Sequence, residues 1–230
     1  MAIPNLWKLW MYKTLRLLEV DELQLPTETI EEFERLYETY IVHGHGDVIP
    51  YTSPFPKYMF LHYLIEQKQV LIHGSNIGNI ERFEPKEQLL FNGKPVKAVF
   101  AASDGIWPMF FACINRREYT GSLRNACLTV PTKKGIKRFY YFSVEPFEGE
   151  LWNDGWIYIM PKQMFTHGGI KDEWICETHV KPLAKLAVTP ADFPFLKNVR
   201  YHNRGNRLFN FISKFSLFKS KIFSIMSKNL

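Results

Sequence analysis

The spacing of hydrophobic residues changes at about residue 70 of this chain. Before that point apolar residues recur at helical intervals, and Thr27 stands where it can cap a predicted helix that runs to about Tyr40. A shorter helix is expected from about Tyr58 to Gln67, after a loop rich in glycine and proline at 42–56. The first helix carries one stripe of apolar side chains, formed by Phe33, Leu36, Tyr37 and Tyr40.

After residue 70 the apolar runs become short and are separated by Gly, Pro, Asn or Asp, a pattern that is typical of strands and turns. One further helix is predicted at 104–114, because Ser103 or Asp104 can cap it and Pro108 is tolerated in a first helical turn. The predicted strands are 70–72, 96–101, 126–130, 138–144, 156–160, 174–177 and 185–188.

Early helices followed by many short strands favour an α+β fold with a mainly antiparallel β core over a regular βαβ alternation. The length of 230 residues suits one substantial core. We therefore expect three parts: an N-terminal helical segment at 1–69 that packs on the core, an α+β core at 70–200, and a basic amphipathic C-terminal helix at 201–230.

The expected C-terminal helix has two interpretations. Residues 204–230 contain six lysines and arginines and no acidic residue, while the rest of the chain is nearly balanced in charge. The helix either packs on the protein's own core, as amphipathic helices commonly do, or lies on an anionic membrane surface. Its predicted apolar face consists of Leu208, Phe211, Ile212, Phe215, Phe218, Ile222, Phe223 and Met226, opposite Lys214, Lys221 and Lys228.

Composition narrows the class of protein. Hydrophobic residues make up 46% of the chain and charged residues 23%, which is ordinary globular usage, and the aromatic share of 16% is high. Three widely spaced cysteines, Cys113, Cys127 and Cys176, predict reduced, buried thiols and not a disulfide framework. Because we find neither a signal peptide nor a membrane-spanning run, we expect a cytoplasmic protein, with peripheral membrane association as the alternative.

Several common catalytic motifs are absent from the sequence. The chain has no GxGxxG, GxxxxGK[ST], GxSxG or HExxH motif, which removes the main sequence support for dinucleotide-fingerprint, phosphate-loop, serine-hydrolase and zincin classes. His43, His45 and Asp47 have the spacing of metal ligands on a strand, but two intervening glycines indicate a loop. No metal is predicted.

Three short segments remain, and they occur in a suggestive order. His73-Gly74-Ser75 ends a predicted strand, a strand-to-helix junction follows near Ser103, and Glu173-Trp174-Ile175 opens a late strand. In this order they resemble the ADP-ribosyltransferase fold of the diphtheria-toxin and poly-ADP-ribose-polymerase type. The resemblance covers roughly residues 70–188.

The resemblance implies a role for each matching residue. His73 would hydrogen-bond the nicotinamide ribose of NAD, Gly74 would contact the carboxamide through its backbone, and Ser75 would support that site. Glu173 would be the catalytic glutamate that stabilises positive charge on the ribose. The family's stacking tyrosine has no counterpart, so either Phe110 or Phe111 would have to supply an aromatic face.

The first hypothesis is therefore an enzyme that cleaves the nicotinamide glycosidic bond of NAD and transfers ADP-ribose to a macromolecular acceptor or to water. The missing tyrosine supports a second hypothesis, a binding or interaction protein of the same fold without turnover. A third is a membrane-surface protein that acts through residues 204–230. The first hypothesis requires that His73, Glu173 and one of the two phenylalanines line a single cleft.

Overall fold

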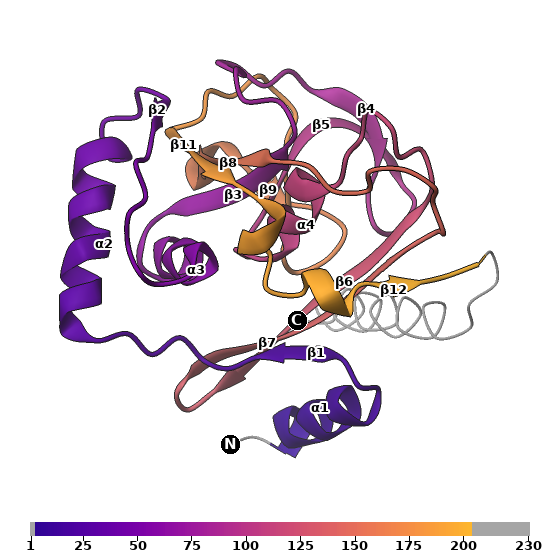
Figure 1. Ribbon diagram of the computed structural model, residues 1–230. Coiled ribbons are helices and arrows are strands. Elements are labelled where there is room, and N and C mark those ends of the chain that lie inside the picture. Colours follow the sequence, from indigo (N-terminus) through magenta and orange to yellow (C-terminus); the bar gives the residue numbers. More distant parts are fainter. Residues whose placement is uncertain (1–2, 204–230) are drawn as a thin grey trace, which may run out of the picture.

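Four α-helices and twelve strands make up residues 3–203, the part of the chain that the computed structural model describes (Figure 1). The mixed α+β prediction is confirmed. The helices are α1 (Ile3–Thr14), α2 (Thr27–Tyr40), α3 (Lys57–Gln67) and α4 (Trp107–Cys113). The strands are β1 (Leu18–Val20), β2 (Asp47–Val48), β3 (Val70–Ser75), β4 (Lys86–Leu89), β5 (Pro95–Ala102), β6 (Leu123–Thr132), β7 (Gly135–Val144), β8 (Gly155–Pro161), β9 (Thr166–His167), β10 (Glu173–Cys176), β11 (Ala184–Val188) and β12 (Arg200–Tyr201).

The larger of two sheets, which we call the long sheet, has the strand order β2-β11-β8-β3-β5-β10-β9, and β4 also pairs with β5. Its pairs are antiparallel except for β11 with β2. Ile72 of β3 pairs with Ala102 of β5, and Ala102 pairs in turn with Glu173 of β10. Paired residues point to the same face of a sheet, so Ile72, Ala102 and Glu173 lie on one face of the three strands.

The second sheet, which we call the β7 sheet, is organised around one strand. β6 pairs with β7 along all ten of its residues. The other edge of β7 receives β1 next to Tyr140 and β12 next to Val144. Segments from near both ends of the described chain thus meet on a single strand.

The main core lies between the two sheets, where α3 and α4 also pack, while α2 lies on the outer side of α3 (Figure 1). Alternate residues of β7 point into this core, and the residues between them point to the other side of the sheet, where α1 covers them. The main core includes Phe33, Phe60, Ile72, Phe110, Tyr140, Phe142, Ile157 and Leu186. A second cluster, on the opposite face of the long sheet, contains Leu71, Phe83, Val99, Tyr158 and Met160.

Two glycines allow α4 to contact the long sheet backbone to backbone. A Cβ atom placed on Gly74 of β3 would lie 2.0 Å from the carbonyl oxygen of Pro108, and one on Gly155 of β8 would lie 2.0 Å from that of Ala112. Such separations are far inside van der Waals contact. The glycine of the His-Gly-Ser segment therefore has a packing role.

The sequence located most of these elements but not all of them. The helix predicted at 104–114 begins three residues later, after a turn in which the side chain of Asp104 accepts hydrogen bonds from the backbone N–H groups of Ile106 and Trp107. The segment 1–69 also contributes β1 and β2, which the sequence did not predict. The expected C-terminal helix at 201–230 falls almost wholly on residues 204–230, which lie outside the described residues. Across residues 3–203, no helix has the length and apolar character needed to cross a membrane.

Gly74→Ala should lower the free energy of unfolding by about 1–3 kcal/mol or more, because the added methyl group must push α4 away from β3. Chemical denaturation of the two proteins measures the difference. Ser75→Ala is the matched control, since it removes only the hydrogen bond from the N–H of Ile77 to the Ser75 hydroxyl and should cost about 1 kcal/mol or less. Equal losses in the two variants would contradict the packing role of Gly74.

Candidate functional site

A cleft of about 400 Å³ opens where the inner face of the β7 sheet meets the end of β5 and the start of β10. Its volume is within the range of small-molecule sites. α3 closes one side through its last turn, and the residue that follows β8 contributes a lysine. The lining side chains used below are Glu66, Ser103, Thr129, Arg138, Lys162, His167, Lys171, Asp172 and Trp174.

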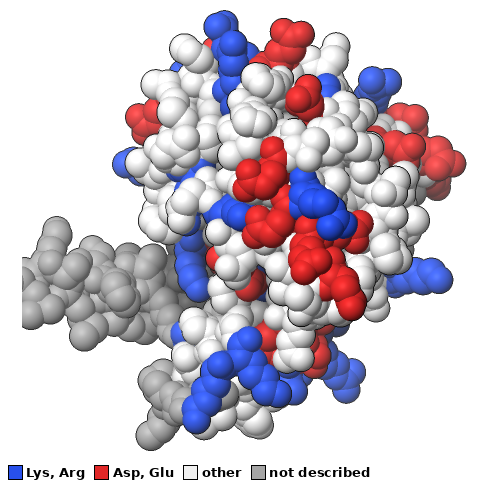
Figure 2. Space-filling model, turned by 90° about the vertical axis from the view of Figure 1, so that its left-hand side faces the viewer, with Lys and Arg blue, Asp and Glu red and all other residues white. Residues whose placement is uncertain are grey.

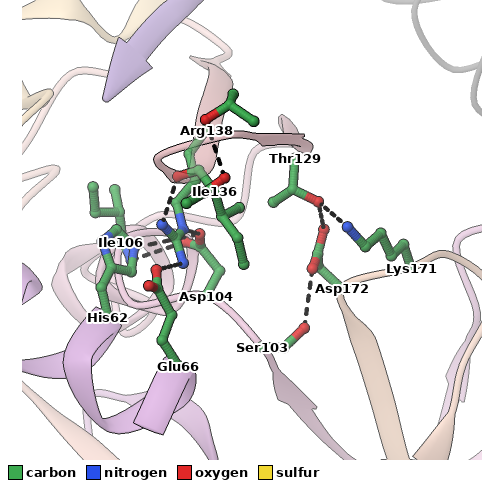
Figure 3. Close-up of polar contacts among 12 residues, drawn as sticks. His62, Glu66, Ser103, Asp104, Ile106, Thr129, Ile136, Arg138, Lys171 and Asp172 are labelled. Atoms are coloured by element: carbon green, nitrogen blue, oxygen red, sulfur yellow. Dashed lines mark hydrogen bonds and ion pairs between the residues drawn. The ribbon is translucent and has the colours of Figure 1, made fainter. Parts of the chain in front are cut away.

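Asp172 is a buried carboxylate within this lining (Figure 3). The hydroxyl of Ser103 donates to one carboxylate oxygen at 3.0 Å, and the hydroxyl of Thr129 donates to the other at 3.1 Å. The ammonium group of Lys171 donates to the Thr129 hydroxyl at 2.7 Å. Burial raises the pKa of Asp172 above its ordinary value, an effect that the nearby Lys171 charge only partly offsets. A carboxylate with a perturbed pKa in a cleft is a common mark of a functional site.

Positive charge and an aromatic ring lie beside Asp172. Across the described residues, neither Lys162 nor Lys171 forms an ion pair with a carboxylate; Lys171 contacts a hydroxyl, and the Lys162 nitrogen lies 5.1 Å from the centre of the Trp174 ring. The His167 ring lies 3.9 Å from the same Trp174 ring, centroid to centroid. The cleft thus combines two cations, an aromatic wall and a carboxylate.

Behind the cleft lies a wholly buried charge network centred on Asp104 (Figure 3). One Asp104 oxygen accepts from the backbone N–H groups of Ile106 and Trp107, at 2.9 and 2.7 Å. The other accepts from the Tyr140 hydroxyl at 2.7 Å and lies 3.3 Å from Nε of Arg138. Asp104 therefore connects the end of β5 with β7 and with α4.

Arg138 joins the network to the cleft. Its Nη2 donates to Glu66 of α3 at 2.7 Å, and its Nη1 donates to the carbonyl of Ile136 at 3.2 Å. Burial alone would raise the pKa of Asp104, but contacts with His62, with the Arg138 charge and with the Trp107 N–H outweigh it and hold that pKa well below the ordinary range. Burial lowers the pKa of His62, whose Nε2 lies 3.5 Å from Asp104. The Asp104 charge is thus balanced chiefly by Arg138.

His73 lies on the opposite face of the long sheet from Glu173. It pairs with Tyr158 and its ring contacts Phe83 edge-on at 4.7 Å, both of which belong to the cluster on the far side of that sheet from α4. Its Nδ1 lies 2.7 Å from the carbonyl oxygen of Phe100, and because a carbonyl can only accept, this nitrogen carries the proton. Burial lowers the pKa of His73, which favours the neutral ring.

Glu173 points to the face that bears Ile72 and Ala102, with which it lies in register. Its side chain folds back onto the turn before β10, where the N–H of Gly169 donates to the carboxylate at 2.5 Å. Only 7% of the residue is exposed, and burial raises the pKa of its carboxyl group. The expected single cleft shared by His73 and Glu173 is therefore wrong, because a strand alternates its side chains and these two residues are out of phase by one.

The aromatic candidates are also placed away from His73. Phe110 is wholly buried among Phe142, Trp152 and Phe193, which leaves no open ring face for a ligand. Phe111 is half-buried against Phe110 and Trp107, on the α4 side of the long sheet. Phe110 thus serves the core, and neither ring shares a cleft with His73. The roles implied for Gly74 and Ser75 stay predictions.

The residues of the cleft carried a weak signal in the sequence. Asp172 directly precedes Glu173, so the late strand was located correctly, and the carboxylate that lines the cleft is the neighbour of the predicted one. Thr129 and Arg138 are paired residues of adjacent strands, and only the register of the β7 sheet brings them to Asp172. A polar pair such as Lys171-Asp172 before a buried strand is the sequence signal that was overlooked.

The cysteines and the histidine-rich loop show no reactive arrangement within residues 3–203. All three cysteines are buried and free, as expected, and burial raises the pKa of Cys113 to about 12. Over the same residues, no group of three or more His, Cys, Asp or Glu side chains is arranged to hold a metal ion.

Comparison with known proteins gives no match. No protein-family model matches the chain, and neither the curated proteins nor the solved structures that were searched give a match. The cleft itself is therefore the feature that indicates a function.

Arg138→Leu should lower the free energy of unfolding by about 3–5 kcal/mol, because it leaves the buried Asp104 carboxylate without its main counter-charge. Denaturant unfolding measures the loss. Lys137→Met, at the neighbouring position of β7, is the control: it breaks ion pairs with the exposed Asp21 and Glu19 and should cost about 1 kcal/mol or less. Similar losses at both positions would mean that the Arg138 charge is not what holds the network.

Asp172→Asn should raise the melting temperature at neutral pH and have a smaller effect near pH 4. Burial raises the folded-state pKa of Asp172, so the folded protein holds its proton more tightly than the unfolded chain. Stability is then lost as the pH rises from about 4, the unfolded pKa of aspartate, through the folded pKa. Asparagine keeps the size, its oxygen can still accept from the Thr129 hydroxyl, and its amide N–H can donate to the Ser103 hydroxyl, so the variant avoids this cost. Melting curves across the pH range would contradict the assignment if the variant were less stable than the wild type at neutral pH.

Proposed function

We propose that this protein binds an anionic small molecule that contains an aromatic ring, in the cleft around Lys171 and Asp172. The observation that supports the proposal most is the pair of ammonium groups, Lys162 and Lys171, that line a concave site without a carboxylate ion pair among the described residues. Two such cations attract anions, and a concave site strengthens the attraction because it lowers the local dielectric.

The rest of the lining supports a nucleotide-type ligand. The Trp174 and His167 rings, which contact each other, give the cleft an aromatic edge against which a base can pack, and Lys162 and Lys171 can hold phosphate oxygens as charge-assisted hydrogen-bond donors. Asp172 can accept hydrogen bonds from sugar hydroxyls or from an amide. NAD, the ligand that the sequence resemblance implies, has all these groups and is the first compound to test.

Binding without turnover fits the geometry better than the predicted mechanism does. Cleavage of NAD by His73 and Glu173 would need both side chains at one nicotinamide riboside, and they lie on opposite faces of the long sheet. If the protein does cleave NAD, Asp172 is the carboxylate that we would expect to stabilise the developing positive charge, because it lines the cleft and Glu173 does not.

Isothermal titration with NAD, ADP-ribose, AMP and nicotinamide tests the proposal. Lys171→Gln and Lys162→Gln should each weaken binding of the phosphate-bearing compounds by roughly tenfold or more, the value of a charge-assisted hydrogen bond. Lys97→Gln, on the exposed side of β5, should leave binding unchanged. The proposal is wrong if none of the phosphate compounds binds, or if the three lysine variants behave alike.

Nicotinamide release, measured on the same samples, separates binding from catalysis. We expect no release above background from the wild-type protein. Should release occur, Asp172→Asn should abolish it and Glu173→Gln should not, because only Asp172 faces the cleft. The reverse result would restore the mechanism that the sequence predicted.

A further inference from the structure

One cation in the cleft serves both the Asp172 carboxylate and the expected ligand. The ammonium group of Lys171 donates to the Thr129 hydroxyl at 2.7 Å, and that hydroxyl donates in turn to Asp172 at 3.1 Å, so Thr129 lies between the two charges (Figure 3). Across residues 3–203, Asp172 takes part in no ion pair, and its other side-chain contact is the Ser103 hydroxyl at 3.0 Å. Lys171 is therefore the cation that favours the ionised form of Asp172.

Asp172 is poorly placed to hold its charge without Lys171. Only 6% of the residue is exposed, and burial raises its pKa; the Lys171 charge offsets part of this effect, and the Asp104 charge adds to it. Lys171 itself is exposed, and a lysine side chain is long and flexible, so its ammonium group can turn from Thr129 to an anion in the cleft. Asp172 then keeps two neutral hydroxyl donors and faces a further negative charge.

The other charged or titratable groups in the cleft and behind it do not replace Lys171. They are Glu66, Asp104, Cys127, Arg138, Lys162 and His167. The Arg138 charge is shared between Glu66 and Asp104, at 2.7 and 3.3 Å. Burial raises the pKa of Cys127 well above its ordinary value, so this thiol stays neutral. Lys162 would contact the same anion as Lys171, which leaves His167 as the second group in the cleft that can take up a proton near neutral pH.

We propose that the Asp172 carboxylate takes up a proton from the solvent when the cleft binds its anionic ligand. This rests on the proposed function, since it needs an anion at Lys171. The proton removes the buried negative charge that Lys171 no longer offsets. The neutral carboxyl group can then donate a hydrogen bond, either to the Ser103 hydroxyl or to an oxygen of the ligand. Binding of the ligand and binding of the proton therefore favour each other.

Isothermal titration across a range of pH tests the proton uptake. The probe is NAD or ADP-ribose, whichever binds more tightly, because the diphosphate of both stays ionised across the range. The ligand-bound protein holds the proton more tightly than the free protein, so binding should weaken as the pH rises, by up to about tenfold for each pH unit while one proton is linked to each ligand. Two buffers with different ionisation enthalpies measure the proton directly. Asp172→Asn should abolish the uptake and leave the dissociation constant nearly independent of pH.

Two further variants serve as controls. Glu31→Gln also removes one negative charge, but Glu31 is exposed on α2, the helix at the left of Figure 1. Figure 2 shows that side of the molecule, with Asp and Glu gathered across its middle. Glu31→Gln should keep the wild-type proton uptake, because its charge lies outside the cleft. His167→Gln should also keep the uptake, even where its affinity is lower.

Binding without proton uptake in the wild type would overturn the proposal and leave the proposed function intact. Uptake that persists in Asp172→Asn, or that is lost in His167→Gln, would also overturn it. If neither compound binds to the wild type at any pH, the proton linkage is refuted, and titration with AMP decides whether the proposed function fails too. Should melting curves show that Asp172→Asn is unfolded, carbon-13 NMR follows the carboxyl groups of the wild type with and without ligand, and unchanged titration midpoints would overturn the proposal.

Discussion

The arrangement of the two sheets depends on the buried contacts of the Asp104 carboxylate with Arg138 and Tyr140. Asp104 follows β5, which is a strand of the long sheet. Its partners come from β7, from α3 and from the first turn of α4. A buried charge is tolerated only where opposite charge and hydrogen-bond donors surround it, and Arg138, Tyr140 and the start of α4 supply both to the Asp104 oxygens. Arg138, fixed in this way, then forms part of the cleft wall beside Ser103 and Thr129.

The sequence predicted the elements whose pattern follows a simple period. The stripe of α2 and the apolar runs of β3, β8 and β11 fall where they were expected. Two kinds of element were missed for physical reasons. α1 has apolar residues on both of its sides, so it shows no single stripe, and β4 (Lys86–Leu89) is exposed along its whole length, so no alternation marks it. β4 is a strand because it pairs with β5, and this pairing cannot be seen in the sequence.

The site was harder to predict than the fold because it depends on register. The late strand was expected at about the correct position, but side chains alternate along it, so Asp172 and Glu173 point in different directions. A change of one residue in the position chosen therefore decides whether the side chain lies in the cleft or on the other face. The His-Gly-Ser segment likewise ends a strand as predicted, while its glycine is needed for contact with α4. Thr129 and Arg138 could be found only once the pairing of β6 with β7 was known.

The position of β7 has a consequence for how the chain folds. One edge of β7 is completed by β1 from near residue 20 and by β12 from near residue 200, so the pairs that close this sheet join segments that are distant along the chain. β1 precedes its partner β7 by more than a hundred residues, and β12 follows every strand of the long sheet along the chain. Contacts between such distant segments slow folding, and an unpaired edge invites association with other chains. The edge of β7 is therefore the last strand edge of the described fold to be completed in the order of the chain.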